Sequence, residues 1–168
     1  VALTRDRRWA HQPSALSVVN LANGGSQRVH PSATTKPGKK TGCVVLGSGK
    51  VSYDLIEVAA RRGVNDVAIL RVEQLYPFPR KEISAELAKY PATKEIIWCQ
   101  EEPMNQGAWY QIQHHLLACI GDEHSLHYAG RVRPPAPAAG HLSTHVAEQA
   151  ALVEQALVAS PGMNHAAD

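Results

Sequence analysis

The apolar residues of this chain predict strands and helices that alternate from about residue 42 onward. Short, almost continuous apolar runs are typical of strands covered on both faces, and they are followed by stretches with apolar residues at helical spacing. Such alternation with short connections favours an α/β fold of three layers, with a mostly parallel sheet and helices on both faces. The predicted strands are 43–46, 67–72, 96–99 and 125–128, and the predicted helices are 51–62, 80–90, 108–120 and 145–158.

The segments outside this pattern define the expected domain limits. Residues 1–41 mix arginine with proline and paired glycine, so no apolar periodicity develops, and we expect an N-terminal arm or linker there. Residues 42–158 form the predicted α/β domain. Residues 159–168 are expected to be a disordered tail.

Composition narrows the class of protein. A chain of 168 residues with 44% hydrophobic residues suits one globular domain, and its net charge of +2 gives no reason to expect a nucleic-acid partner. No apolar run approaches the roughly 18 residues that span a bilayer, so we expect no membrane partner. The three cysteines form no C-x-x-C pair, which favours reduced core thiols and a cytoplasmic location. The chain starts at Val1 and its first methionine is Met104, which predicts a fragment or a processed chain.

The turn 47–50, Gly-Ser-Gly-Lys, follows the first strand and resembles a phosphate-binding loop. A Walker loop requires glycine where Val44 stands and serine or threonine where Val51 stands, and a dinucleotide fingerprint requires glycine in place of Ser52. The pattern therefore favours a tight turn between strand and helix. An anion held by the helix N-terminus stays open as the alternative.

The histidines do not form a convincing metal set. His141 and His145 are four residues apart, but only two ligands are present and no glutamate follows His141, while His114 and His115 point to different helix faces. We expect no metal bound by this chain. No G-x-S-x-G nucleophile motif is present either, so the sequence gives no support for covalent hydrolysis.

The loop 100–107 contains the most unusual polar sequence of the chain. Glu101 and Glu102 follow the third strand, at the end where open α/β sheets place functional loops. They could act as a pair of acid and base, or they could accept hydrogen bonds within the loop. Trp109 adds large amphipathic area typical of interfaces, whereas Trp98 suits the core.

Several segments together resemble one family, the C-terminal domain of the thiamine-diphosphate-dependent decarboxylase component of the 2-oxoglutarate dehydrogenase complex. The run Gln-Glu-Glu-Pro-Met-Asn-Gln-Gly-Ala-Trp is long and chemically unusual, and the resemblance covers about 12–158. The family usually has cysteine where Gly47 stands, tyrosine where Ser52 stands and a bulky apolar residue near Ser26, which puts local packing in question. The segments that carry the resemblance are 45–55, 71–79 and 98–110, with 128–131, 137–140 and, more weakly, 21–24.

The resemblance implies a transketolase-type C-terminal domain that supports the interface of a homodimer. Enzymes of the family bind thiamine diphosphate and magnesium, decarboxylate 2-oxoglutarate and pass the succinyl group to a lipoyl-bearing succinyltransferase component. The resemblance places the cofactor-binding and proton-transferring residues upstream, so we assign no catalytic residue here and expect the isolated chain to be inactive. The residues expected to face the subunit interface are Glu101, Glu102, Asn105, Gln106 and Trp109.

The resemblance also implies a regulatory site. Some members of the family are regulated by a nucleotide-containing effector bound near a Gln-Leu-x-Pro-x-Pro-Arg segment, which corresponds here to Gln74, Arg80 and Lys81, with Arg28 close by. Basic side chains beside a strand end suit a phosphate, although they could also be solvated charges at a helix start. Two other functions stay open, a free-standing nucleotide-binding module and a purely structural domain for complex assembly.

Overall fold

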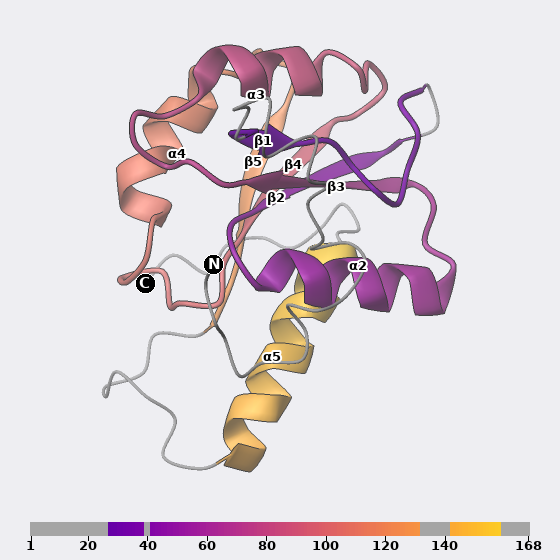
Figure 1. The fold of residues 1–168 in the computed structure, drawn as a ribbon, viewed down its shortest axis with the longest axis vertical. Helices are drawn as coiled ribbons and strands as arrows, with labels where there is room; N and C mark the ends of the chain where they lie inside the picture. Colours follow the sequence, from indigo (N-terminus) through magenta and orange to yellow (C-terminus); the bar gives the residue numbers. More distant parts are fainter. Residues whose placement is uncertain (1–26, 39–40, 132–141, 159–168) are drawn as a thin grey trace, which may run out of the picture.

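The computed structural model describes residues 27–38, 41–131 and 142–158, and it contains the alternation that the sequence predicts (Figure 1). The predicted helix 51–62 is reproduced, and it ends at Gly63, whose left-handed conformation directs its amide to the carbonyls of Ala59 and Ala60. The elements are β1 (Val29–His30), β2 (Cys43–Gly47), α2 (Val51–Arg62), β3 (Val67–Val72), α3 (Arg80–Leu87), β4 (Glu95–Cys99), α4 (Trp109–Leu117), β5 (Ser125–Ala129) and α5 (Leu142–Leu157).

The strands form one five-stranded sheet in the order β1-β3-β2-β4-β5. Strands β2, β3, β4 and β5 are parallel, and β1 pairs with β3 in the antiparallel direction. Helices α3 and α4 lie on one side of the sheet and α2 and α5 on the other (Figure 1). The predicted fold class, a three-layer α/β fold with a mostly parallel sheet, is confirmed.

Both faces of the sheet are buried, and residues along each central strand alternate between two cores. In β2, all five residues are buried, with Val44 and Leu46 facing α3 and α4 and Cys43 and Val45 facing α2 and α5. Polar residues are absent from this strand because water covers neither of its faces. The near-continuous apolar runs therefore follow directly from the helices that cover the sheet on both sides.

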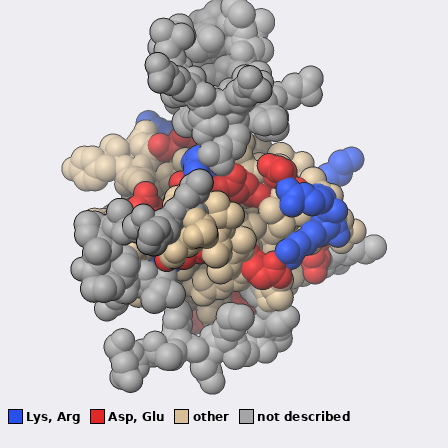
Figure 2. All heavy atoms as spheres, turned by 90° about the horizontal axis from the view of Figure 1, so that it is seen from below, with Lys and Arg blue, Asp and Glu red and all other residues tan. Residues whose placement is uncertain are grey.

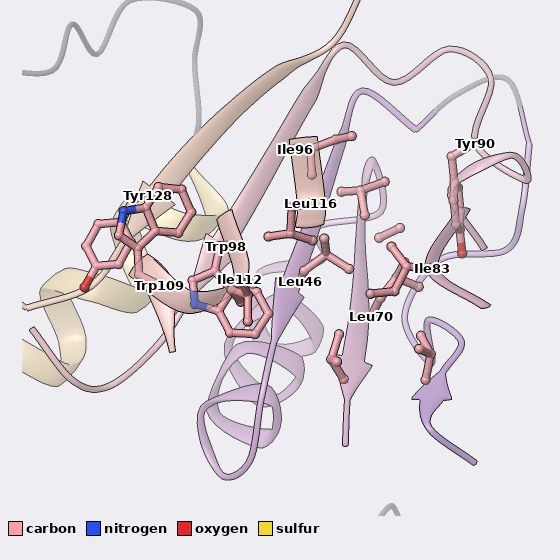
Figure 3. Packing of buried hydrophobic residues seen from close by; sticks show 14 residues of the cluster. Leu46, Leu70, Ile83, Tyr90, Ile96, Trp98, Trp109, Ile112, Leu116 and Tyr128 are labelled. Carbon is pink, nitrogen blue, oxygen red and sulfur yellow. The ribbon is translucent and has the colours of Figure 1, made fainter. Parts of the chain in front are cut away.

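The core beneath α3 and α4 contains the larger side chains. Trp98 of β4 is completely buried, and Ile112 of α4 lies beside it (Figure 3). Trp109 and Tyr128 occupy one end of this core and Tyr90 the other (Figure 3). Burial of an aromatic side chain removes some 150–250 Å² of surface from water. This face of the sheet therefore contributes a large share of the hydrophobic stabilisation.

The structure differs from the predicted domain limits at the N-terminal side. Strand β1 lies inside 1–41, the expected arm, where its residue Val29 pairs with Val72 of β3 and is itself buried. Ser32 reinforces this attachment, because its hydroxyl accepts the amide hydrogen of Ile69 at 3.1 Å. The expected tail, 159–168, lies outside the described residues. No helix in the described part of the chain has the length and apolar character needed to cross a membrane.

Charged side chains on the face formed by α2 and α5 are mixed in sign (Figure 2). Arg61 pairs with Glu57 at 2.7 Å within α2, and Arg62 pairs with Glu154 of α5 at 2.6 Å. The side chains of these pairs are about half exposed or more, so each pair contributes less than about 1 kcal/mol to the free energy of unfolding. Basic side chains gather at one side of this face, with acidic side chains directly beside them (Figure 2).

Candidate functional site at the carboxyl edge of the sheet

The carboxyl ends of β2 and β4 meet at the point where the chain connections reverse direction. From β2 the chain passes through α2 to β3 on one side, whereas β4 and β5 lie on the other side. Open α/β sheets bind ligands in the crevice above such a reversal. Two loops, 48–50 after β2 and 100–108 after β4, therefore occupy the position where function is most expected.

The first of these loops is a tight turn that brings α2 close to the sheet. A side chain at Gly47 would lie 3.2 Å from the Ser52 hydroxyl and 3.4 Å from the Cys99 carbonyl oxygen, so only a hydrogen fits there without adjustment. Gly49 adopts a positive φ of 70°, a conformation that other residues rarely adopt. The turn places Lys50 at the N-terminus of α2, directly above the reversal point.

Lys50 forms an ion pair across the two strand ends. Its Nζ lies 2.9 Å from Oε1 of Glu101, although the contact lacks the alignment of a hydrogen bond. The two side chains are only 24% and 26% exposed, so water screens the attraction less than at an open surface. Glu101 is therefore held beside a cation and not directed freely outward.

Gln100 organises the second loop from within. Its Oε1 accepts hydrogen bonds from Trp98 Nε1 at 2.9 Å and from the Trp109 amide at 3.2 Å. Its Nε2 donates towards the carbonyl oxygens of Glu102, Pro103 and Gln106, at 3.2, 3.2 and 2.8 Å. The residue is 3% exposed, so these contacts replace water almost completely.

Tyr128 of β5 holds the same loop from the other side. Its hydroxyl donates a hydrogen bond of 2.9 Å to the Glu102 carbonyl oxygen, and its ring lies 5.2 Å from that of Trp109 at an angle of 53°. Burial raises the pKa of Tyr128 to about 12, so its hydroxyl stays protonated and able to donate at neutral pH. The loop is thus attached to both β4 and β5.

The five residues expected at the interface do not all occupy the same environment. Glu102, Asn105 and Gln106 are exposed on the loop, and Glu101 is half-buried against Lys50. Trp109, in contrast, is only 8% exposed and packs in the core of this chain. We had expected Trp109 to face a partner subunit, but its indole lies on the buried face of α4 and packs beneath the loop.

Helix α5 is connected to the same edge of the sheet by polar contacts. Gln149 donates to Oδ2 of Asp54 in the first turn of α2 at 2.9 Å and accepts from Arg131, which follows β5, at 3.0 Å. Arg131 also pairs with Glu148 at 3.6 Å. Gln149 therefore connects α5 both to the first turn of α2 and to the residue that follows β5.

The residues expected to bind an effector gather at the neighbouring corner, where β1 meets β3. The Arg28 carbonyl oxygen accepts the amide of Glu73 at 2.8 Å and that of Gln74 at 3.4 Å. The Arg28 guanidinium pairs with Glu82 of α3 at 3.2 Å, and the Gln74 side chain donates to the Pro77 carbonyl at 2.7 Å. Arg28 and Gln74 thus lie together beside the start of α3.

The other two expected effector residues begin α3 and differ in direction. Arg80 is turned towards α4, where its Nη2 lies 2.5 Å from Nδ1 of His115, and the His115 ring stacks on Phe78 at 5.1 Å. Lys81 is exposed in the first turn of α3. The structure therefore brings all four residues to one corner, with Arg80 engaged by α4.

The three cysteines differ in burial. Cys43 and Cys99 are buried, and burial raises the pKa of each thiol to about 12, so neither ionises near neutral pH. Cys119 is half-buried and its Sγ lies 3.7 Å from the Arg80 carbonyl oxygen. The suggested pair of His141 and His145 cannot be assessed, because His141 lies outside the described residues.

Sequence reasoning missed the residue at the centre of the loop. Gln100 was part of the unusual run after β4, but its role depends on partners up to nine residues away. The sequence contained one indication of this role. Gln100 is a long uncharged polar residue directly after the buried run 96–99, where an amide without hydrogen-bond partners would be costly. Tyr128 and His115 were missed for the same reason, since each acts through a contact between different elements.

The fold and this edge define a doubly wound α/β domain with its functional loops at the carboxyl end of the sheet. Comparison with known sequences then identifies the family. Residues 17–157 match the family described as 2-oxoglutarate dehydrogenase C-terminal. The chain therefore belongs to that family, and the predicted resemblance is confirmed.

Relatives from three bacteria are each named "2-oxoglutarate dehydrogenase E1 component". The protein of Cupriavidus necator is 44% identical over 143 residues, which cover 85% of this chain and 15% of that protein. The proteins of Coxiella burnetii and Azotobacter vinelandii are 45% and 42% identical and cover 94% and 93% of this chain. This chain spans only 15% to 17% of the length of these relatives.

Proposed function

We propose that this chain is the C-terminal, interface-forming part of a 2-oxoglutarate dehydrogenase of the succinyl-transferring type. The observation that carries the proposal is the match over 17–157, together with relatives named as the E1 component. The complete enzyme would oxidatively decarboxylate 2-oxoglutarate and transfer the succinyl group to a lipoyl-bearing succinyltransferase component. Its three free thiols support a reducing, cytoplasmic location.

The described residues do not fit a thiamine diphosphate and magnesium site. Within 27–38, 41–131 and 142–158, no three His, Cys, Asp or Glu side chains lie close enough to hold a metal ion. At the reversal point, moreover, the Lys50 ammonium is already paired with Glu101. We therefore assign thiamine diphosphate and magnesium to parts of the enzyme outside this chain and assign no catalytic residue within it.

The loop 100–108 is the surface that we assign to the subunit interface of a homodimer. Its exposed side chains, those of Glu102, Asn105 and Gln106, stand on a backbone that is fixed by buried hydrogen bonds. A fixed backbone lowers the entropic cost of ordering an interface on association. Trp109 contributes to this role through the loop that it supports.

The corner around Arg28, Gln74, Arg80 and Lys81 is the surface that we assign to a nucleotide-containing effector. Three cationic side chains lie there beside the N-terminus of α3, which favours an anionic group. Glu82 already neutralises Arg28 in part, so an incoming phosphate would compete with it. An effector bound at this corner would contact Arg80, and the contact between Arg80 and His115 would transmit a shift of Arg80 to α4.

The first experiment measures release of carbon dioxide from 2-oxoglutarate by the complete polypeptide, with thiamine diphosphate and magnesium supplied. We expect turnover by the complete polypeptide and none by the isolated 168 residues. Turnover by the isolated chain would contradict the assignment of the active site elsewhere. A complete polypeptide that uses a different oxo acid and not 2-oxoglutarate would contradict the assigned reaction.

The second experiment tests the effector corner by calorimetric titration of the complete polypeptide with adenosine diphosphate as the probe. We expect a double variant, Arg28→Ala with Lys81→Ala, to have a dissociation constant for the probe that is higher by about tenfold or more, because two charged contacts to phosphate are lost. Arg61→Ala, an exposed arginine on α2, is the matched control. Equal weakening by both proteins would contradict a specific site, and tight binding by the isolated chain alone would favour a free-standing nucleotide-binding module.

A further inference from the structure

Gln100 is an unusual buried residue for the edge of a sheet. Four polar residues are buried in the described part of the chain, and Gln100 is the only one with an amide side chain, the others being Thr41, Ser52 and Thr93. A primary amide offers two N–H donors and one oxygen that can accept two hydrogen bonds. Every one of these positions is used.

The two ends of the amide contact different parts of the structure. The oxygen faces two N–H donors, the indole of Trp98 in the core and the backbone amide of Trp109 at the start of α4. The nitrogen faces three carbonyl oxygens of the loop, of which that of Gln106 is nearest at 2.8 Å. The amide thus joins the core, the loop and the helix that follows.

The loop closes tightly around this amide. Gly107 has a positive φ of 70°, and a side chain there would come within 3.0 Å of the Gln100 nitrogen and of the Glu102 Cβ. The Glu102 carbonyl oxygen also receives the Tyr128 hydroxyl. Glu101, located between these fixed points, is presented to Lys50 at 2.9 Å.

We infer that Gln100 is the positioning residue of this edge, and that its amide sets the placement of Glu101, Glu102 and Gln106. The inference rests on the proposed function in one respect, because the surface being positioned is the one assigned to the subunit interface. Gln100 itself is only 3% exposed. It acts entirely through the loop backbone.

The chemistry of the contacts specifies an amide and excludes its closest isostere. Glutamate at position 100 would keep the shape and the acceptor for Trp98 and Trp109, but a carboxylate would direct a negative oxygen at three carbonyl oxygens. A protonated carboxylic acid would restore one O–H donor towards Gln106. A Q100E variant should therefore order the loop at low pH and release it at higher pH.

The experiment compares Q100E with the wild-type complete polypeptide at pH 5.5 and pH 8. Hydrogen exchange of the amides in 102–109 reports the loop, and the dimer dissociation constant reports the interface. Q113E, on the neighbouring helix, is the matched control with the same change of charge. Nearby titratable groups are Glu101, Glu102, Lys50 and Tyr128, and the wild type and the control correct for them.

We expect Q100E to exchange the loop amides about tenfold faster or more at pH 8, because several buried contacts lose their donor. At pH 5.5 the exchange should return most of the way to that of the wild type, while Q113E follows the wild type at both values. Unchanged exchange in Q100E at pH 8, or acceleration that does not recover at pH 5.5, overturns the inference.

The interface measurement separates the inference from the proposed function. Faster loop exchange with a weakened dimer supports both. Faster exchange with an unchanged dimer supports the positioning role and contradicts the interface assignment, whereas a weakened dimer with unchanged exchange contradicts the positioning role. If Q100E does not fold at pH 8, it is refolded at pH 5.5, and failure at both values also overturns the inference.

Discussion

Lys50 Nζ lies 2.9 Å from Glu101 Oε1 and thereby joins the ends of two neighbouring parallel strands at the point where the sheet connections reverse. Each side chain is about one quarter exposed, so the pair lies between a solvated ion pair and a buried one. Within the described part of the chain, neither side chain forms a second ion pair. The pair therefore couples the turn before α2 to the loop after β4.

A double-mutant cycle measures this coupling. We expect Lys50→Met and Glu101→Gln to show a coupling of about 1 kcal/mol in the free energy of unfolding, since the pair is partly shielded from water. Urea unfolding of the four proteins gives the value. The exposed pair of Arg61 and Glu57, whose side chains are 66% and 67% exposed, is the control and should give about 0.3 kcal/mol. Equal couplings would show that the position at the reversal point has no special electrostatic effect.

Gly107 and Gly49 allow backbone strain to be separated from crowding. Both have a φ of 70°, but a side chain at Gly49 would meet nothing within 4 Å, whereas one at Gly107 would meet Gln100 and Glu102. We expect Gly49→Ala to cost about 1 kcal/mol for the conformation alone. Gly107→Ala should cost about 1–3 kcal/mol more, because the loop must move away from the Gln100 amide. The free energy of unfolding of each variant tests this, and equal losses would contradict crowding at Gly107.

Much of the fold followed from the sequence because the central strands are buried on both faces. The runs 43–46, 67–72 and 96–99 contain few polar residues for that reason, and each predicted strand agrees with the structure to within one residue. Strand β1 was missed because two residues in a proline-rich segment show no periodicity. Its existence depends on pairing with β3, which is a tertiary contact.

The sequence predicted where the candidate site lies but not how its side chains are oriented. Strand ends of an α/β sheet indicated the loop 100–108, but the sequence did not show that Gln100 would turn inward while Glu102 remained exposed. Trp109 was expected at an interface because of its large amphipathic area, whereas the packing of α4 places its ring against Tyr128 in the core of this chain. These outcomes depend on side-chain direction, which hydrophobic pattern alone does not determine.

The buried thiols predict a loss of stability at alkaline pH. Burial raises the pKa of Cys43 and Cys99 from 9.0 to about 12, with Glu95 and Glu101 respectively adding to the effect. Between these values the unfolded chain loses the protons and the folded chain retains them, so stability is full below about pH 9 and falls as pH rises towards 12. Each thiol contributes a slope of about 1.4 kcal/mol per pH unit in that window.

Urea unfolding at pH 8, 9 and 10 checks the alkaline loss, and Cys43→Ala should reduce its slope. A thiol reagent provides an independent measurement, because half-buried Cys119 should react in the native protein while Cys43 and Cys99 react only on unfolding. Rapid modification of all three thiols in the folded protein would contradict the burial on which the prediction rests.

The contact between Arg80 and His115 predicts an acid-dependent change at the effector corner. Partial removal from water, with His114 and Arg80 adding to it, lowers the pKa of His115 below its usual 6.5. The folded chain therefore binds fewer protons than the unfolded chain just below pH 6.5. The free energy of unfolding is unaffected by His115 above pH 6.5 and decreases as pH falls below that value. Protonation would place a cation against the Arg80 guanidinium.

Resonances of the His115 ring, followed by NMR from pH 8 to 4, give its pKa directly. We expect Arg80→Met to raise that pKa and Lys81→Met to leave it nearly unchanged, since Lys81 is exposed on the neighbouring position of α3. An equal effect of both substitutions would mean that general positive charge, and not the direct contact, controls His115.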